Sequence, residues 1–310
     1  MLEALDTSKA TALANCLINE PLGPKTTLGV GGAARFYAEP SDTEALRALL
    51  IEAQQSAVPV FVLGRGSNLL VMDEGYPGLV IRLHGPVWKE ITVMDHERLH
   101  VMGGTRLKGI SLKAAALGWS GFEFLEGIPG SLGGALRMNA GAMGSCMADC
   151  LESLEFMDFA GTLHRLARAD LEFQYRSCEA LKAGVVVSAI LKKREQKDPA
   201  DVYAHTEAYA LKRKQSQPRA PSAGCAFKNP KSHPAGLLID ECGLKGLALG
   251  NAKISELHAN FLINSGSAKS EDVIALVKQV REAVLAHKGI ALEPELLLLG
   301  KTWGEVLKPA

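Results

Sequence analysis

The 310-residue sequence has no excess of charge of either sign, since 34 Lys and Arg residues balance 34 Asp and Glu residues. Such a chain lacks the field that holds nucleic acid or an anionic membrane by bulk electrostatics. No apolar run reaches the roughly 18 residues that a membrane-spanning helix needs, and the N-terminus lacks a basic segment followed by an apolar one. We therefore expect no nucleic-acid partner, no membrane insertion and no export, which together predict a cytoplasmic protein.

The six cysteines include no C-x-x-C pair. Scattered cysteines are typical of buried thiols in a reducing compartment, rather than of a disulfide framework or a zinc site. We expect no metal site, and we expect most of the thiols to be core residues.

Two helices can be predicted from caps and periodicity. Residues 41–44 have capping-box spacing, which predicts a helix over 42–55. Ser270 is a candidate cap for a second helix that ends at Gly289, where a glycine suits the left-handed C-terminal position.

The strand signals indicate an α+β fold in more than one domain. The apolar run 58–63 predicts a buried strand, and 79–83 predicts another. Residues 87–194 alternate short apolar runs with glycine-rich connections, which favours a strand-rich α+β domain. The charged stretch 192–198, closed by Pro199, is the candidate linker.

Two segments concentrate glycine: Gly64-Arg65-Gly66-Ser67-Asn68, and 127–134 leading to Asn139-Ala140-Gly141. Without side chains, backbone N–H groups can converge on an anion such as a pyrophosphate. Each cluster alone is equally compatible with tight turns. The first is not a Rossmann fingerprint, because the third glycine is missing. The glycine-rich element 26–32 lies upstream of both, and this combination favours the phosphate-binding interpretation.

The ordered motifs resemble the FAD-binding fold of the vanillyl-alcohol-oxidase (PCMH) type and, within it, the UDP-N-acetylenolpyruvoylglucosamine reductase family in its shorter form. The motifs that carry the resemblance extend over nearly the whole chain: residues 26–32, 63–71, 122–125, 127–134, 138–142, Tyr175-Arg176-Ser177, Ser222-Ala223-Gly224-Cys225, 227–230, 235–239, His258-Ala259-Asn260-Phe261 and 292–295.

The resemblance implies an α+β protein with a two-part FAD-binding module and a C-terminal α+β substrate-binding domain. We expect FAD-binding subdomain 1 at 1–84, with 291–310 packing back onto it. Subdomain 2 is expected at 85–198 and the substrate-binding domain at 199–290. The implied cofactor residues are Gly64, Arg65, Gly66, Ser67, Asn68, Leu69, Gly127, Ile128, Pro129, Gly130, Ser131, Gly134, Asn139, Ala140 and Gly141.

The implied activity is the NADPH-dependent, FAD-mediated reduction of UDP-N-acetylglucosamine enolpyruvate to UDP-N-acetylmuramate in peptidoglycan precursor synthesis. No histidine in either glycine loop is placed to anchor the flavin, so we expect non-covalent FAD. We also expect a monomer.

The resemblance assigns catalysis to Arg176, Cys225 and Glu295. Hydride addition at C3 leaves negative charge at C2 that spreads into the carboxylate, and a preorganised guanidinium stabilises such charge. Glu295 beside that charge is expected to have a raised pKa. Out of context, the arginine would be a surface ion pair and the glutamate a solvated turn residue.

Cys225 stands where most family members have the serine that protonates C2. A free thiol, with a pKa of about 8.5, is mostly protonated at neutral pH and is a better acid than a hydroxyl. A cationic neighbour would favour an idle thiolate instead. Read alone, Cys225 would be a small buried hydrophobe.

Tyr175, Lys228, Asn229 and His258 match positions that contact the UDP-sugar. Ser216 and Leu297 depart from the family pattern, since each replaces an expected basic residue, and both losses remove anion contacts. Two alternatives stay open: another flavin oxidoreductase of the same fold, which would lack the third-domain motifs, and a non-catalytic flavin- or nucleotide-binding partner in a cell-wall complex.

Overall fold

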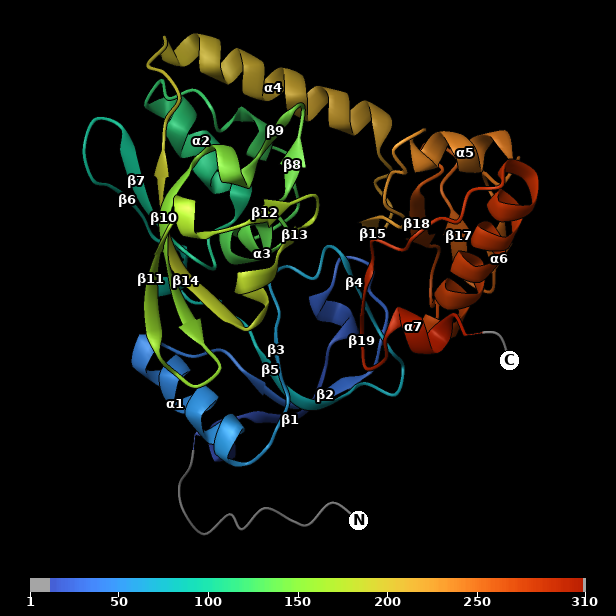
Figure 1. Ribbon diagram of the computed structural model, residues 1–310, viewed down its shortest axis with the longest axis horizontal. Coiled ribbons are helices and arrows are strands. Elements are labelled where there is room, and N and C mark those ends of the chain that lie inside the picture. Colours follow the sequence, from blue (N-terminus) through green and yellow to red (C-terminus); the bar gives the residue numbers. More distant parts are fainter. Residues whose placement is uncertain (1–11, 309–310) are drawn as a thin grey trace. The chain divides into compact units, whose positions relative to one another are not determined.

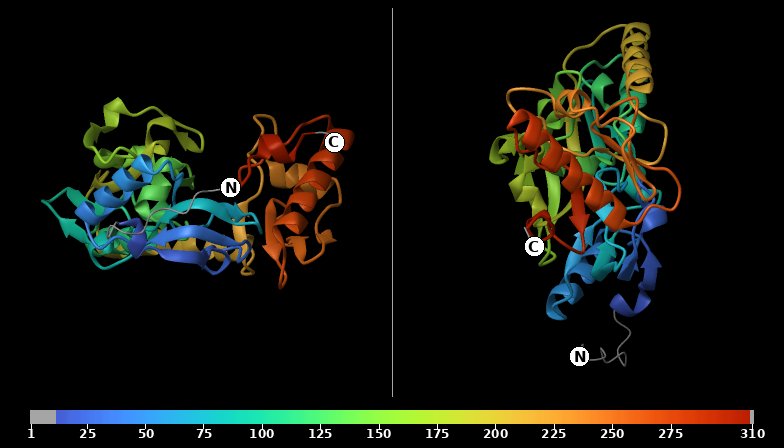
Figure 2. Two further views of the ribbon diagram at one scale, coloured as in Figure 1. Left: turned by 90° about the horizontal axis from the view of Figure 1, so that it is seen from below. Right: turned by 90° about the vertical axis from the view of Figure 1, so that its right-hand side faces the viewer.

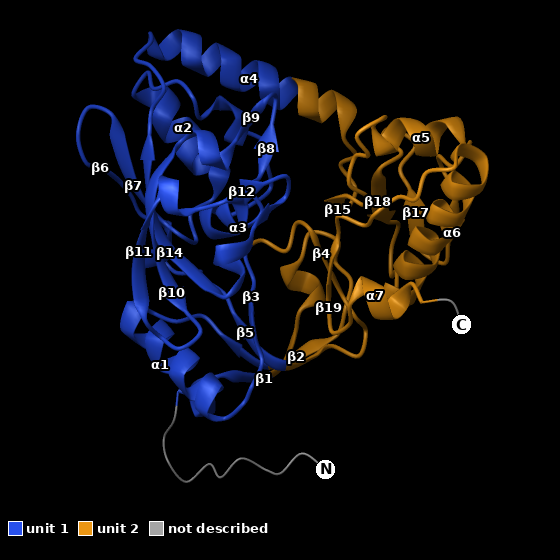
Figure 3. Ribbon diagram, in the orientation of Figure 1, with its two compact units in different colours: residues 1–18, 36–64, 78–211 blue, residues 19–35, 65–77, 212–310 orange. Residues whose placement is uncertain are grey.

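The computed structural model describes residues 12–308 (Figure 1). The expectation of no export signal falls partly on residues 1–11, which lie outside that range. The chain forms two compact units: unit 1 is 1–18, 36–64 and 78–211, and unit 2 is 19–35, 65–77 and 212–310 (Figure 3). Both mix helices and strands. Among the described residues, no helix has the length and apolarity to cross a bilayer.

A five-stranded antiparallel sheet of order β11-β10-β14-β7-β6 forms the centre of unit 1. Its strands are β6 (Ile91–Val93), β7 (Arg98–Met102), β10 (Leu151–Asp158), β11 (Leu163–Ala167) and β14 (Gly184–Lys192). β14 pairs on both sides and is the most deeply buried strand of this sheet, as its apolar Val185–Val187 run favours. The strand-rich α+β expectation for 87–194 is confirmed.

The helices of unit 1 are α1 (Thr43–Gln55), α2 (Leu107–Ala116), α3 (Leu132–Arg137) and the larger part of α4 (Pro199–Ser216). α1 confirms the helix predicted over 42–55. Its N-cap is Asp42, whose Oδ1 accepts from the Ala45 N–H at 2.8 Å. Ser41 donates its hydroxyl hydrogen to the Asp42 carboxylate, so the cap lies one residue later than the sequence spacing indicates.

A second sheet has the order β1-β2-β5-β3, with β1 (Leu17–Pro21), β2 (Ala33–Ala38), β3 (Val60–Val62) and β5 (Tyr76–Ile81). β3 pairs in parallel with β5, with Phe61 opposite Val80. The strand predicted over 58–63 exists, but the expectation that it is buried is wrong. β3 is an edge strand with one neighbour, and its three residues are only partly buried.

The charged stretch 192–198 is hydrogen-bonded along its length. Arg194 N–H donates to Ser120 O at 2.9 Å, Ser120 N–H donates to Glu195 O at 3.1 Å, and Lys197 N–H donates to Gly118 O at 2.8 Å. α4 begins at Pro199, as suits a residue without an N–H at the first helical position. The compact units divide within α4, between 211 and 212, and the predicted three-domain borders stay predictions.

Unit 2 contains a four-stranded antiparallel sheet of order β15-β18-β17-β16, along which α6 lies (Figures 1 and 2). Its elements are β15 (Ser222–Cys225), β16 (Ala248–Leu249), β17 (Ala252–Ile254), β18 (Phe261–Asn264), α5 (Ala235–Glu241), α6 (Ser270–Lys288) and α7 (Trp303–Val306). Residues of α6 at helical spacing, such as Val273, Val277 and Val280, form much of the core.

The predicted C-terminal end of α6 is confirmed, because Gly289 adopts φ 68°. The predicted N-cap is wrong: Lys269 is the capping residue and Ser270 is the first helical residue. The fully buried Ser270 hydroxyl instead accepts from the Asp73 N–H, and the Ser270 N–H donates to the Asp73 carboxylate. The Ser270 side chain is therefore bonded to the distant residue Asp73 and is not available to cap the helix.

The segment after α6 returns to residues far back in the chain. β19 (Leu297–Leu299) pairs in parallel with β4 (Leu69–Val71), with Leu298 opposite Leu70. Two short antiparallel ladders complete the strands: β8 (Gly141–Ala142) with β9 (Ser145–Cys146), and β12 (Phe173–Gln174) with β13 (Ser177–Cys178).

Candidate active site

The loop 64–68 follows β3 without opening a helix, as the missing third glycine indicates. Gly66 has φ 62°, and a Cβ there would lie 2.8 Å from Thr26 Cα. Thr27 N–H donates to Gly66 O at 3.2 Å, and the Thr27 hydroxyl donates to Ser222 O at 2.6 Å. The upstream glycine-rich element thus packs directly against this loop within unit 2, where only glycine fits.

Backbone donors in this loop are open. Among residues 12–308, no acceptor takes the N–H groups of Gly64, Gly66, Ser67 or Asn68. Unpaired backbone donors are uncommon in folded proteins unless water or a ligand takes them. A glycine-rich run of such groups is the arrangement that receives a phosphate.

The second glycine loop closely approaches Gly64 within unit 1. A Cβ on Gly64 would lie 2.8 Å from Ser131 Oγ, so the two loops approach too closely for a side chain. The Ile128 N–H donates to Leu125 O, and the Gly130 N–H donates to Ile128 O. Within the described chain, the N–H groups of Gly127, Ser131 and Gly134 have no acceptor. These open N–H groups are of the kind that receives a phosphate.

Residues 139–141 differ from these loops. Asn139 N–H donates to Leu136 O at 3.0 Å, and Ala140 N–H donates to Ala135 O at 2.8 Å. Gly141 pairs with Cys146 in the β8–β9 ladder. Asn139 and Ala140 therefore offer no open backbone donor to an anion.

Arg176 lies in unit 1 at the tip of a tight hairpin. Gln174 pairs with Ser177, so Tyr175 and Arg176 form the loop between β12 and β13. Arg176 has φ 59°, a left-handed conformation that costs a non-glycine residue about 1–2 kcal/mol. Its guanidinium carbon lies 5.6 Å from the centre of the Tyr175 ring, which is 60% exposed. Strain of this kind is concentrated at functional sites.

Cys225 and Glu295 lie on adjoining segments of unit 2. Cys225 is the last residue of β15, opposite Phe261 of β18. Glu295 N–H donates to the carbonyl of Ala226, the residue after Cys225, at 2.8 Å. Asn68 Nδ2 donates to Glu295 O at 3.1 Å. The fold therefore places the backbone of Glu295 beside that of Ala226, the residue after Cys225, and fixes it from two sides.

The predicted sugar-nucleotide residues of unit 2 have protein partners. Lys228 Nζ lies 3.1 Å from Glu293 Oε2, and Asn229 Oδ1 accepts from the Ala235 N–H at 2.9 Å. His258 Nδ1 accepts from the Asn260 N–H at 3.2 Å, which places the proton of the neutral ring on Nε2. Burial lowers the pKa of His258. These bonds do not use the Asn229 amide NH₂ or the His258 Nε2–H.

Asn260 is a positioning residue to which sequence reasoning gave no role. It is 2% exposed, and its amide accepts from the Phe227 N–H at 2.9 Å and donates to Phe227 O at 2.8 Å. Its carbonyl also accepts from the Ala226 N–H. Asn260 thus fixes the backbone immediately after Cys225. The available signal was an amide side chain inside an apolar run.

The two departures from the family pattern lie in regular elements. The hydroxyl of Ser216, the last residue of α4, donates to Lys212 O at 2.9 Å. Leu297 pairs with Leu69 in the β19–β4 ladder. Neither side chain supplies a charge.

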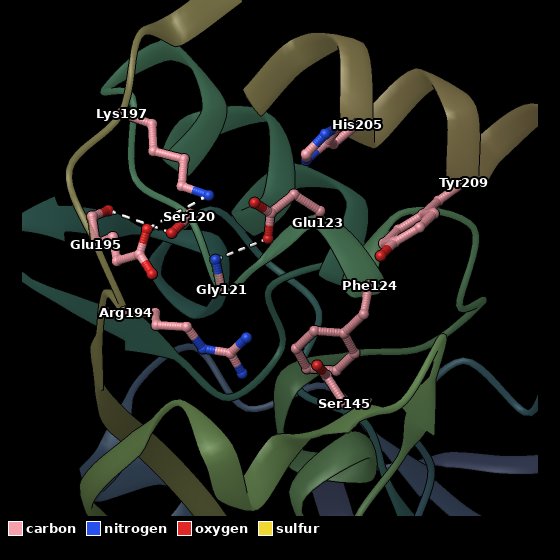
Figure 4. Close-up of a pocket in the computed structure, with 10 residues that line it drawn as sticks. All are labelled: Ser120, Gly121, Glu123, Phe124, Ser145, Arg194, Glu195, Lys197, His205 and Tyr209. Atoms are coloured by element: carbon pink, nitrogen blue, oxygen red, sulfur yellow. Dashed lines mark hydrogen bonds and ion pairs between the residues drawn. The ribbon is translucent and has the colours of Figure 1, made fainter. Parts of the chain in front are cut away.

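A cavity of about 160 Å³ in unit 1 is lined by none of the predicted catalytic or ligand-binding residues (Figure 4). It lies among Ser120–Phe124, Arg194–Lys197 and the α4 residues His205 and Tyr209. Pockets for ligands of cofactor size are larger, about 300–1,000 Å³. Glu123 and Lys197 are already engaged, by the Gly121 N–H and by Glu195. We assign it no part in the chemistry.

Comparison with known proteins decides the family. A model of an FAD binding domain matches residues 34–167, and a model of the UDP-N-acetylenolpyruvoylglucosamine reductase C-terminal domain matches 217–299. A UDP-N-acetylenolpyruvoylglucosamine reductase of Synechococcus sp. (strain JA-3-3Ab) is 42% identical over 282 residues, 90% of each chain. This chain belongs to the UDP-N-acetylenolpyruvoylglucosamine reductase family.

Two further similarities also cover more than nine-tenths of this chain. The reductase of Moorella thermoacetica is 39% identical over 292 residues, 94% of each chain. The crystal structure of the reductase from Thermus caldophilus has a TM-score of 0.78 and 39% identity, covering 92% of this chain and 98% of that one. The predicted family and α+β fold class are confirmed, as is FAD as the cofactor. The matched C-terminal domain also excludes a flavin oxidoreductase that lacks the third-domain motifs.

Proposed function

We propose that this protein reduces UDP-N-acetylglucosamine enolpyruvate to UDP-N-acetylmuramate, a peptidoglycan precursor, with NADPH as reductant. The observation that carries the proposal is the coincidence of a reductase-family match over about nine-tenths of the chain with two glycine loops whose N–H groups are open. The cofactor residues we propose are those of the sequence analysis other than Asn139, and open backbone N–H groups among them receive the pyrophosphate.

Bound FAD supplies the hydride that reaches C3 of the enolpyruvyl group. The guanidinium of Arg176 receives the substrate carboxylate as a two-pronged partner and stabilises the negative charge that develops at C2. The left-handed backbone at Arg176 supports this role, because strained conformations of this kind are concentrated at active and ligand-binding sites.

The proton is added at C2 from the Sγ–H of Cys225. The C2–H bond forms as the S–H bond breaks, and the thiolate regains a proton from solvent before the next turnover. The backbone of Cys225 is well fixed, by the β15–β18 pairing and by Asn260 on the following residues. Glu295, which is 8% exposed, holds a proton and donates a hydrogen bond to the charge near C2.

The sugar nucleotide is bound by Tyr175, Lys228, Asn229 and His258. The exposed Tyr175 ring offers an apolar face, and Lys228 offers a positive charge that Glu293 holds in place. Asn229 and His258 offer the N–H groups left over from their contacts within the protein. We further propose that the enzyme works as a cytoplasmic monomer without nucleic-acid or membrane partners.

The test is NADPH oxidation by the purified yellow protein under anaerobic conditions, with UDP-N-acetylglucosamine enolpyruvate or with UDP-N-acetylglucosamine as control. We expect oxidation with the first substrate alone. Flavin binding without substrate-dependent oxidation would overturn the proposal in favour of a non-catalytic partner. Equal NADPH oxidation with both compounds would overturn the proposal in favour of a different reductase.

A further inference from the structure

The hairpin that carries Arg176 has little stability of its own. β12 and β13 have two residues each and pair only with each other. An isolated two-stranded ribbon is marginal in water even when it is longer. Contacts from outside the ladder must therefore hold Tyr175 and Arg176 in place.

Asn139 makes such a contact. Its Nδ2 donates to the carbonyl of Gln174, the last residue of β12, at 3.2 Å. Its Oδ1 accepts from the Ala148 N–H at 3.2 Å. Its backbone N–H also donates to Leu136 O. The backbone donor and both ends of the side-chain amide are therefore bonded within the protein.

Arg168 also contacts the hairpin and the segments beside it. Its Nε donates to Ala148 O at 3.1 Å and its Nη1 donates to Leu171 O at 3.0 Å. Its guanidinium carbon lies 4.8 Å from the centre of the Phe173 ring. The peptide of Ala148 therefore links Asn139 to Arg168, and the two side chains hold β12 at consecutive residues, Gln174 and Phe173.

We propose that Asn139 positions Arg176 by holding the β12–β13 hairpin through Gln174, and that it is not a flavin ligand. The left-handed backbone of Asn139, at φ 39°, suits Asn and fixes the amide in this direction. The proposal rests on the proposed function, because it requires Arg176 to act on the substrate. A displacement of about 1 Å at a catalytic group can cost on the order of 10²-fold in rate.

Asn139→Asp is the discriminating variant. It keeps the size, the tolerance of positive φ and the acceptor for Ala148, but it sets a carboxylate oxygen against Gln174 O. Asn19→Asp is the matched control, since Asn19 also has positive φ and is exposed in β1. For Asn139→Asp we expect unchanged FAD content, unchanged flavin reduction by NADPH, and substrate turnover lowered about 10- to 100-fold.

A double variant tests whether Asn139 acts through Arg176. Adding Asn139→Asp to Arg176→Ala is expected to cause no further loss of turnover. Losses that multiply would overturn the proposal, as would loss of FAD by Asn139→Asp while the hairpin stays protected.

Hydrogen exchange of residues 171–182 tests the proposal without turnover, and so separately from the proposed function. We expect faster exchange of the hairpin amides in Asn139→Asp than in the wild type or in Asn19→Asp. Should Asn139→Asp not fold, Arg168→Lys removes the stacking on Phe173 and should give the same change to a smaller degree. Unchanged exchange in a folded variant would overturn the proposal.

Discussion

Cys225 ends β15 at the point where two distant segments meet its neighbours: Asn260 from before β18 and Glu295 from after α6. Position alone distinguishes it from the other thiols. Burial raises the pKa of Cys150 to about 12 and that of Cys16 to about 11, so these two stay protonated and inert. None of the six cysteines, all of which lie within the described residues, forms a disulfide, and Cys225 is only partly buried.

We predict that Cys225→Ser keeps much of the activity, because a hydroxyl still provides a proton at the same position. Cys225→Ala should lower steady-state turnover about 10²- to 10⁴-fold, the usual contribution of a general acid, while NADPH still reduces the flavin. Cys242→Ala, at another partly buried thiol, is the control. Wild-type turnover by Cys225→Ala would refute the assignment. The pH–rate profiles of wild type and Cys225→Ser should differ on the alkaline side, where the thiol ionises first.

His258 should make stability depend on pH. Burial lowers its pKa below the ordinary value of about 6.5, so the unfolded chain takes up the proton at higher pH than the folded one. This contribution is complete above the unfolded pKa and is lost as pH falls toward the folded pKa. We expect the free energy of unfolding to fall below about pH 6.5, by no more than about 1.4 kcal/mol per pH unit.

Urea unfolding between pH 7 and 5 measures the effect of His258. His258→Gln should flatten the pH dependence, and His96→Gln, at an exposed histidine, should leave it as in the wild type. Identical slopes for both variants would show that His258 is not the group responsible.

Several residue roles had no local signal. The left-handed backbone of Arg176 depends on closure of the β12–β13 hairpin. The bonds of Asn260 to Phe227 join residues 33 positions apart. Sequence patterns identify Arg176, Cys225 and Glu295 as candidates, but not the neighbours that hold them, because those contacts depend on the folded backbone.

At the scale of elements, periodicity predicted α1 and α6 well because each buries one apolar face. Element ends were less predictable. Ser41 and Asp42 compete for one cap, and Ser270 is taken by Asp73 from a distant turn. The burial of β3 was misjudged because an apolar run does not show how many neighbours a strand will have.

Alanine substitutions at two glycines distinguish the effect of helix propensity from the effect of backbone conformation. A Cβ would meet nothing within 4 Å at Gly109 of α2 or at Gly289, but only Gly289 has positive φ. Gly109→Ala should stabilise the protein by about 0.5–1 kcal/mol, and Gly289→Ala should destabilise it by about 1 kcal/mol. Urea midpoints followed by circular dichroism measure both. Shifts of the same sign would contradict this account of the α6 terminus.

At the scale of the whole molecule, the order of the motifs predicted the family, the α+β class and the flavin cofactor. Each motif combines glycine or a charged residue with specific neighbours in the sequence. The arrangement of the chain was harder to predict. Both compact units are built from three separate stretches, and Asn68 bonds to Glu295 across 227 positions. Pairing over such separations depends on the completed fold, which local patterns do not encode.

The central claim is that this chain adds a hydride at C3 and a solvent-exchangeable proton at C2 of an enolpyruvyl sugar nucleotide. The most direct measurement is proton NMR and mass spectrometry of the product formed in D₂O with unlabelled NADPH. We predict UDP-N-acetylmuramate that carries deuterium at C2 of the lactyl group, because the thiol of Cys225 exchanges with solvent. NADPH oxidation without this product, or a product free of deuterium at C2, would contradict the account.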